Sequence, residues 1–202
     1  DHAGVEVVGV IPRDKDMHLS MRHLGLVPAL EGERRHRGFL ERLEKIRQVV
    51  EEGLKIDRIQ EIAEEAEPLE VPEPDLYKRT DLGDGVRIGV ALDEAFNFYY
   101  RDNIELIERA GAEVVPISPM HDASLPQVDG IYIGGGYPEL YAEELSTNRS
   151  MISSIRQAHD KGIPIFAECG GLIYLSREVE YDEKSHTLVG LVPGRSRTVS
   201  YT

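Results

Sequence analysis

Short apolar runs alternate with amphipathic segments between residues 86 and 175. The runs VRIGVAL, AEVVPIS, VDGIYIGGG and IPIFAE are rich in β-branched residues and end at glycine, proline or polar turns, which predicts strands. Segments between them, such as YRDNIELIERAG and NRSMISSIRQAHDKG, repeat their apolar residues at three- and four-residue steps, which predicts helices. Strands that alternate with helices in this way predict the α/β class, with a parallel sheet covered by helices on both faces.

The first 66 residues carry a separate pattern. The run VEVVGVI predicts a buried strand, and two amphipathic helices are expected after it, the first from Phe39 to a stop at Gly53 and the second from Ile56. Three prolines then fall within seven residues, with no usable period around them. We therefore expect a linker over residues 67–85, between a first part at 1–66 and the α/β domain at 86–202. A long surface loop is the alternative to a linker.

Composition and charge exclude several classes of function. The formal net charge of −14 argues against a nucleic acid partner, because binding phosphates needs a basic face. No apolar run is long enough to span a membrane, so we expect no membrane partner. The single cysteine, Cys169, excludes an internal disulfide and a cysteine-based zinc site, and it fits a reducing compartment, hence the cytoplasm.

That cysteine follows a predicted strand and precedes two glycines, in IPIFAECGGLIYL. A strand that runs through a small-residue turn into a helix is the arrangement of a nucleophile elbow. The helix expected from Gly170 directs its first N–H groups toward the thiol, which stabilises a thiolate, and the N–H of Gly170 is placed to form half of an oxyanion hole. A core cysteine is the alternative, but it would not need Gly170 and Gly171 behind it.

A second glycine-rich turn follows another strand, in IYIGGGYPE. Ligands of parallel α/β sheets bind beyond the carboxyl ends of the strands, where both turns are expected. The backbone N–H groups around Gly135 and Gly136 can receive an anion or a carbonyl oxygen and supply a second oxyanion donor. A plain strand-to-helix turn is the alternative. The turn matches neither a P-loop nor a dinucleotide-binding motif.

No residue is marked by its surroundings as the base for this cysteine. A thiol nucleophile usually works with a histidine, and the chain has seven, each of which we expect at the surface. They are His2, His18, His23, His36, His121, His159 and His186. Glu168, beside the cysteine, is expected to have a structural or substrate-facing role.

Five motifs follow one another along nearly the whole chain. They are RHLGLVPA, DEAFNFYYRDN, SPMHD, GIYIGGGYPELYAEELSTNRSM and PIFAECGGLIYLS. Together they resemble the cobyrinic acid a,c-diamide synthase family. The closely similar nickel-sirohydrochlorin a,c-diamide synthases carry the same motifs, so the substrate stays open between the two. The resemblance implies a class I glutamine amidotransferase domain of flavodoxin-like fold, preceded by the tail of an ATP-dependent, dethiobiotin synthetase-like amidoligase domain.

The resemblance also implies an activity. In this family ATP and Mg²⁺ activate the a and c acetate carboxylates of a tetrapyrrole, and ammonia from glutamine converts them to amides in cobalamin or coenzyme F430 biosynthesis. By position, Cys169 matches the nucleophile that forms a thioester with glutamine, and Gly135, Gly136, Gly170 and Gly171 match the oxyanion and glutamine-binding turns. Glutamine and a corrinoid or related tetrapyrrole are the expected partners, and a homo-oligomer stays open.

Two parts of the family pattern are missing. The chain has no P-loop motif, and the catalytic histidine of the family is expected beyond Cys169. We therefore expect these 202 residues to be part of a longer enzyme, to lack most of its ATP and Mg²⁺ site, and to have little synthase activity alone. Ala167 stands where the usual G-x-C-x-G elbow has its first glycine. The alternatives are a cobyric acid synthase-type amidotransferase, a stand-alone thiol hydrolase of the same fold, and a non-catalytic binding module.

Overall fold

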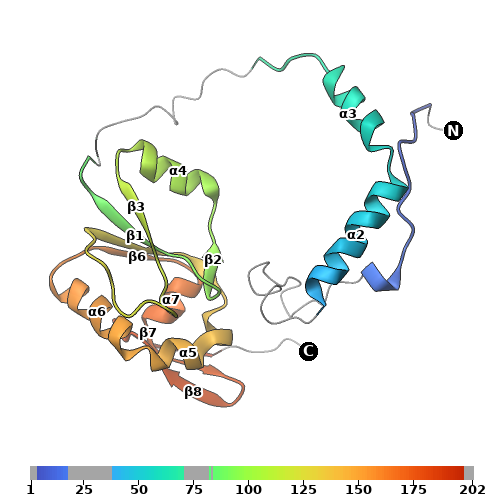
Figure 1. Ribbon diagram of the computed structural model, residues 1–202. Helices are drawn as coiled ribbons and strands as arrows, with labels where there is room; N and C mark the ends of the chain where they lie inside the picture. The colour runs from blue at the N-terminus through green and yellow to red at the C-terminus, as the bar shows by residue number, and fades with distance from the viewer. Residues whose placement is uncertain (1–3, 18–37, 71–81, 83, 198–202) are drawn as a thin grey trace. The chain divides into compact units, whose positions relative to one another are not determined.

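Figure 1 shows a computed structural model of the chain, which describes residues 4–17, 38–70, 82 and 84–197. The chain divides into two compact units, residues 1–72 and 73–202, and this boundary falls within the stretch 67–85 that was expected to be a linker. The motif RHLGLVPA, most of the expected linker and four of the histidines lie outside the described residues. These histidines are His2, His18, His23 and His36.

The described part of the first unit holds a short 3-10 helix, two α-helices and an extended segment. The elements are η1 (Lys15–Met17), α2 (Phe39–Gly53) and α3 (Ile56–Glu64). Both helices lie where the sequence predicts them. The prediction of a buried strand in VEVVGVI is wrong, because Val5, Val7 and Val10 are exposed and, among the described residues, the segment pairs only through a bridge between Gly9 and Leu54. A strand is buried where other strands and helices cover it, and the described residues of this unit supply no such cover.

A parallel sheet of four strands forms the centre of the second unit, in the order β3–β1–β4–β6. The strands are β1 (Arg87–Ala91), β3 (Glu113–Ile117), β4 (Gly130–Ile133) and β6 (Ile165–Ala167). Every neighbouring pair is parallel, because each connection returns the chain to the end of the sheet at which the preceding strand began. Of the four strands in this sheet, β3 is the second along the chain, and it lies on the outer side of β1, the first. This is the flavodoxin-like order. The predicted fold class is confirmed.

Helices cover both faces of this sheet, and Figure 1 shows α4 above it and α5, α6 and α7 below it. Alternate residues of a strand point to opposite faces. Ile131 and Ile133 of β4 therefore pack in the core with Met151 and Ile155 of α6, whereas Tyr132 faces α4. No helix in the described ranges is long and apolar enough to cross a membrane. The bounds are α4 (Arg101–Arg109), η3 (Pro138–Tyr141), α5 (Ala142–Thr147), α6 (Arg149–Asp160) and α7 (Gly170–Leu175).

Two further groups of paired strands were not predicted. One is an antiparallel pair, and the other is a three-stranded sheet in the order β8–β7–β9. The turn between β7 and β8 places Asp182 and Glu183 at positive φ, and it lacks the glycine or asparagine that usually marks such a hairpin. The bounds are β2 (Phe96–Phe98), β5 (Gly135–Gly136), β7 (Ser176–Tyr181), β8 (Lys184–Thr187) and β9 (Val192–Arg197).

Candidate active site

Cys169 lies on a strained turn between β6 and α7. Its backbone has φ 49° and ψ −113°, outside the regions that residues with a side chain normally occupy. Such a conformation costs roughly 1–3 kcal/mol, and it persists only where the surrounding structure imposes it. The cysteine is exposed, which contradicts the alternative of a core thiol. An exposed thiol on a sharp, strained strand-to-helix turn has the geometry of a nucleophile elbow.

The elbow and the second glycine-rich turn are in direct contact. A Cβ atom built on Gly170 would lie 2.9 Å from Cδ of Pro138 and 3.1 Å from both the backbone N and O of Gly136. Cβ atoms essentially never lie as close as 2.9 Å to another heavy atom, so a side chain at Gly170 would require Pro138 and the backbone of Gly136 to shift. The structure thus brings Gly136 beside the residue that follows Cys169, as an oxyanion site formed by both turns requires.

Gly171 has a different part in this contact. Its N–H donates to the carbonyl oxygen of Gly134 at 2.9 Å and to that of Glu168 at 2.8 Å. A Cβ atom at Gly171 would lie 2.1 Å from the carbonyl oxygen of Ile133, so no side chain fits. Because this N–H is already bonded to Gly134 and Glu168, the structure gives Gly171 a packing role, and the glutamine-binding role expected of it stays a prediction.

The second turn is held by an unpredicted strand. In the β2–β5 pair, Phe96 lies opposite Gly136 and Phe98 opposite Gly135. Gly136 has φ 156°, and a Cβ atom there would lie 1.9 Å from the carbonyl oxygen of Ala95. Close approach of two backbones, rather than loop flexibility, is therefore the reason for this glycine. The predicted oxyanion turn is a paired and well-defined piece of backbone.

Asp93 organises the loops at the carboxyl ends of β1 and β3, and the sequence analysis did not single it out. This buried carboxylate accepts four hydrogen bonds. One oxygen accepts from the N–H groups of Ala95 at 2.9 Å and Phe96 at 3.2 Å, and the other from Oγ of Ser118 at 2.9 Å and the N–H of Met120 at 3.0 Å. The bonds two and three residues ahead form an Asx turn, so an aspartate directly after a strand was the available sequence signal.

Three of the seven histidines lie in the described part of the chain, and none of them hydrogen-bonds to Cys169 there. His159 is exposed in α6. His121 is also exposed, and its Nε2 lies 2.8 Å from a carboxylate oxygen of Glu94. His186 is half-buried in β8, where the sequence predicted an exposed polar turn. The described residues therefore do not supply the histidine that a thiol nucleophile needs.

Glu168 is fixed by a tyrosine of the neighbouring strand. The hydroxyl of Tyr132 donates to Oε1 of Glu168 at 2.5 Å. Burial raises the pKa of Tyr132, and the carboxylate of Glu168 raises this pKa further, so the hydroxyl keeps its proton and stays a donor. Of the two roles expected for Glu168, this bond supports the structural one.

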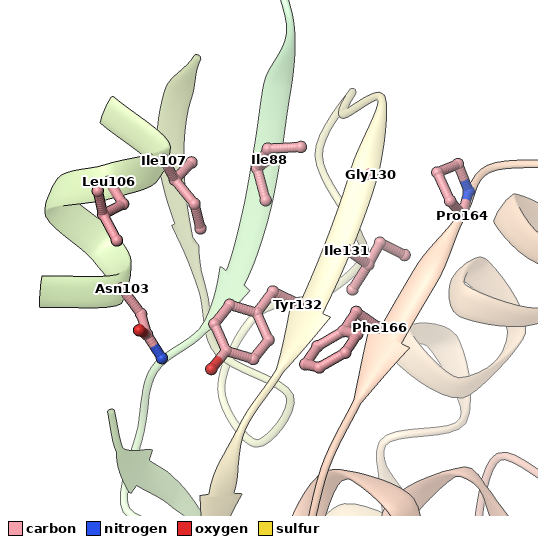
Figure 2. Close-up of a pocket in the computed structure, with 9 residues that line it drawn as sticks. All are labelled: Ile88, Asn103, Leu106, Ile107, Gly130, Ile131, Tyr132, Pro164 and Phe166. Atoms are coloured by element: carbon pink, nitrogen blue, oxygen red, sulfur yellow. The ribbon is translucent and has the colours of Figure 1, made fainter. Parts of the chain in front are cut away.

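A pocket of about 430 Å³ lies on the face of the sheet that α4 covers. Figure 2 shows its apolar walls, with Asn103 and the hydroxyl of Tyr132 at one end. The walls come from α4 and from strands β1, β4 and β6, through residues such as Ile88, Leu106, Ile107 and Phe166. Cys169 is not among the residues that line this pocket, so the pocket and the elbow are separate places on the domain.

Comparison with known proteins identifies the family. The CobB/CobQ-like glutamine amidotransferase domain matches residues 87–199, a range that includes the elbow and the β2–β5 turn. The chain belongs to the CobB/CobQ-like glutamine amidotransferase family. For this family, a cysteine on a strained elbow beside a glycine-rich turn is a candidate glutaminase site.

Individual relatives of this CobB/CobQ-like chain are cobyrinate a,c-diamide synthases. The enzyme of Methanosarcina barkeri is 49% identical over 99% of the chain and 45% of its own length. That of Methanothermobacter thermautotrophicus is 44% identical over 98% of the chain and 44% of its own length, and that of Listeria innocua 41% over 97% and 42%. The chain thus spans less than half the length of these relatives. The predicted resemblance to cobyrinic acid a,c-diamide synthases is confirmed.

Proposed function

We propose that Cys169 is the nucleophile of a glutaminase that supplies ammonia to a ligase reaction. The observation that carries this proposal is an exposed cysteine with a strained backbone, followed by two residues, Gly170 and Gly171, that contact the Gly134–Gly136 turn. Proteins keep such strain where a function needs it, and membership of the glutamine amidotransferase family supplies the function.

The chemistry follows from this geometry. The thiolate of Cys169 attacks the side-chain amide carbon of glutamine, and the carbonyl oxygen becomes an oxyanion. Backbone N–H groups of Gly170 and of the Gly135–Gly136 turn stabilise this charge, and one such donor is worth about 3 kcal/mol. The C–N bond then breaks, the nitrogen takes a proton and leaves as ammonia, and water hydrolyses the thioester to glutamate and free thiol. We assign the proton transfers to a histidine outside the described residues.

The wider reaction is inferred from the relatives. In the full-length protein, ammonia amidates the a and c acetate carboxylates of a tetrapyrrole in the cytoplasm, with ATP and Mg²⁺ activating the carboxylates. Cobyrinic acid is favoured over nickel-sirohydrochlorin because the relatives carry the name of the cobyrinate enzyme. Residues 1–66 belong to the ligase part. Among the described residues no group of three or more His, Cys, Asp or Glu could hold a metal ion, so none of them is assigned to Mg²⁺.

The test separates the glutaminase from the ligase in the full-length protein. Amidation of cobyrinic acid is followed with ATP and either glutamine or ammonium chloride as nitrogen donor, and nickel-sirohydrochlorin is the second substrate. Cys169→Ala should abolish amidation from glutamine and leave amidation from ammonia unchanged, whereas Ser153→Ala, at an exposed position of α6, should leave both unchanged. A Cys169→Ala protein that still uses glutamine would show that the nucleophile is elsewhere.

A further inference from the structure

Tyr99, between β2 and α4, joins the carboxyl ends of the two central strands. Its hydroxyl donates to the carbonyl oxygen of Ala91, the last residue of β1. The same hydroxyl accepts the N–H of Gly134 at 2.8 Å, directly after β4. One side chain therefore satisfies an acceptor and a donor on two adjacent strands, where the strands separate and their backbones no longer pair with each other.

The ring of Tyr99 also explains why residue 134 is a glycine. A Cβ atom at Gly134 would lie 2.5 Å from Cε1 and 2.7 Å from Cζ of Tyr99, so only glycine lets the hydroxyl reach this N–H. The ring meets Tyr132 edge-on, with centroids 5.2 Å apart. Tyr132 in turn packs beside Phe166 at the ends of β4 and β6, with centroids 5.3 Å apart (Figure 2). The ring of Tyr99 is thus held by packing as well as by the hydrogen bonds of its hydroxyl.

Gly134 is bound on both sides of its own backbone. Tyr99 holds its N–H at 2.8 Å, and the N–H of Gly171 in the elbow binds its carbonyl oxygen at 2.9 Å. Gly134 therefore helps to fix the distance between the glycine-rich turn and the cysteine elbow. Burial raises the pKa of Tyr99 well above its ordinary value, so its hydroxyl keeps the proton that it donates to Ala91.

We propose that Tyr99 is a positioning residue for the glutaminase reaction. Its hydroxyl sets the place of Gly134 and thereby of the Gly135–Gly136 backbone that lies beside Gly170. Tyr99 touches no reacting atom, and it acts through the backbone that receives the oxyanion. This inference rests on the proposed role of Cys169. A displacement of well under 1 Å in an oxyanion donor weakens transition-state stabilisation, because these donors act only when they are pre-aligned.

The test compares two reagents that label Cys169 in the full-length protein. The diazoketone analogue of glutamine has a carbonyl oxygen that must be polarised, whereas iodoacetamide requires only an accessible thiolate. Tyr99→Phe removes the hydroxyl and keeps the ring, and Tyr100→Phe, at the neighbouring residue with 79% exposure, is the matched control. We expect Tyr99→Phe to slow diazoketone labelling and the kcat of glutaminase about tenfold, with little change in KM. Iodoacetamide labelling should not change, and Tyr100→Phe should alter neither reaction.

The ratio of the two labelling rates separates loss of positioning from loss of fold, since a disturbed fold would alter both rates. The inference would be overturned if the ratio for Tyr99→Phe equals that of the unaltered protein, whether both labelling rates stay the same or both change by the same factor. If the diazoketone fails to label the unaltered protein while iodoacetamide succeeds, the proposed function of Cys169 is wrong and the inference falls with it.

Discussion

Replacement of Cys169 by glycine should stabilise this chain relative to replacement by alanine. The backbone of residue 169, with φ 49° and ψ −113°, disfavours any residue that has a Cβ atom. Alanine keeps the strain of roughly 1–3 kcal/mol, whereas glycine relieves it. Glycine also makes the unfolded chain more flexible, which costs about 0.4–1 kcal/mol. Because the cysteine is exposed, neither change leaves a cavity. The net difference should be about 0.5–2 kcal/mol in favour of glycine.

The measurement is urea denaturation of the two variants, followed by circular dichroism. The control is the same pair of substitutions at Ser153, an exposed position within α6, where alanine should be more stable than glycine by about 1 kcal/mol. The glycine-minus-alanine difference should therefore have opposite signs at the two positions. If glycine is also the less stable residue at position 169, the elbow carries no strain and the reasoning that assigns it a function fails.

Two further sites give predictions about stability. Gly171→Ala would place a methyl group 2.1 Å from the carbonyl oxygen of Ile133 and should lower the free energy of unfolding by about 1–3 kcal/mol. The control is Gly194→Ala, whose methyl group would meet no atom within 4 Å. Equal melting temperatures for the two variants would contradict the packing role of Gly171. Tyr174→Phe removes a buried hydroxyl that has no hydrogen-bond partner among the described residues, so stability should stay the same or rise by about 1 kcal/mol. Burial raises the pKa of Tyr174 in the folded protein above its unfolded value, so this group leaves the free energy of unfolding unchanged below about pH 10 and lowers it as pH rises, because the unfolded chain loses the proton first. Urea denaturation at neutral and alkaline pH should show a smaller alkaline loss in Tyr174→Phe, and an identical pH dependence would argue against this origin.

The parallel sheet could be predicted because its signals are local. The strands of this sheet are compact β-branched runs, helices follow β1, β4 and β6 along the chain, and the connection rules then leave few arrangements. The elbow could be predicted for the same reason, since a cysteine and two glycines between a strand and a helix are adjacent in the chain. Contacts between distant segments could not be predicted. The pairing of Phe96 with Gly136 joins residues forty positions apart, and nothing in FNF alone indicates a strand.

The opposite failure occurred in the first unit. The run VEVVGVI has the composition of a buried strand, yet Val5, Val7 and Val10 are exposed in the described structure. Composition predicts what a segment is suited to, but burial depends on whether other segments cover it. The structure does not test the assignment of residues 1–66 to a ligase domain. That assignment remains a prediction that rests on the resemblance.

The sequence by itself determined the α/β class, the place of Cys169 at the end of a strand, and the family, because each depends on residues that are neighbours in the chain. Only the tertiary structure decided how the two glycine-rich turns meet. It showed that Gly134 is bound by Tyr99 on one side and by Gly171 on the other, and that the N–H of Gly171 is used inside the elbow. These are distances of a few ångströms between segments far apart in sequence, which only the folded backbone brings together.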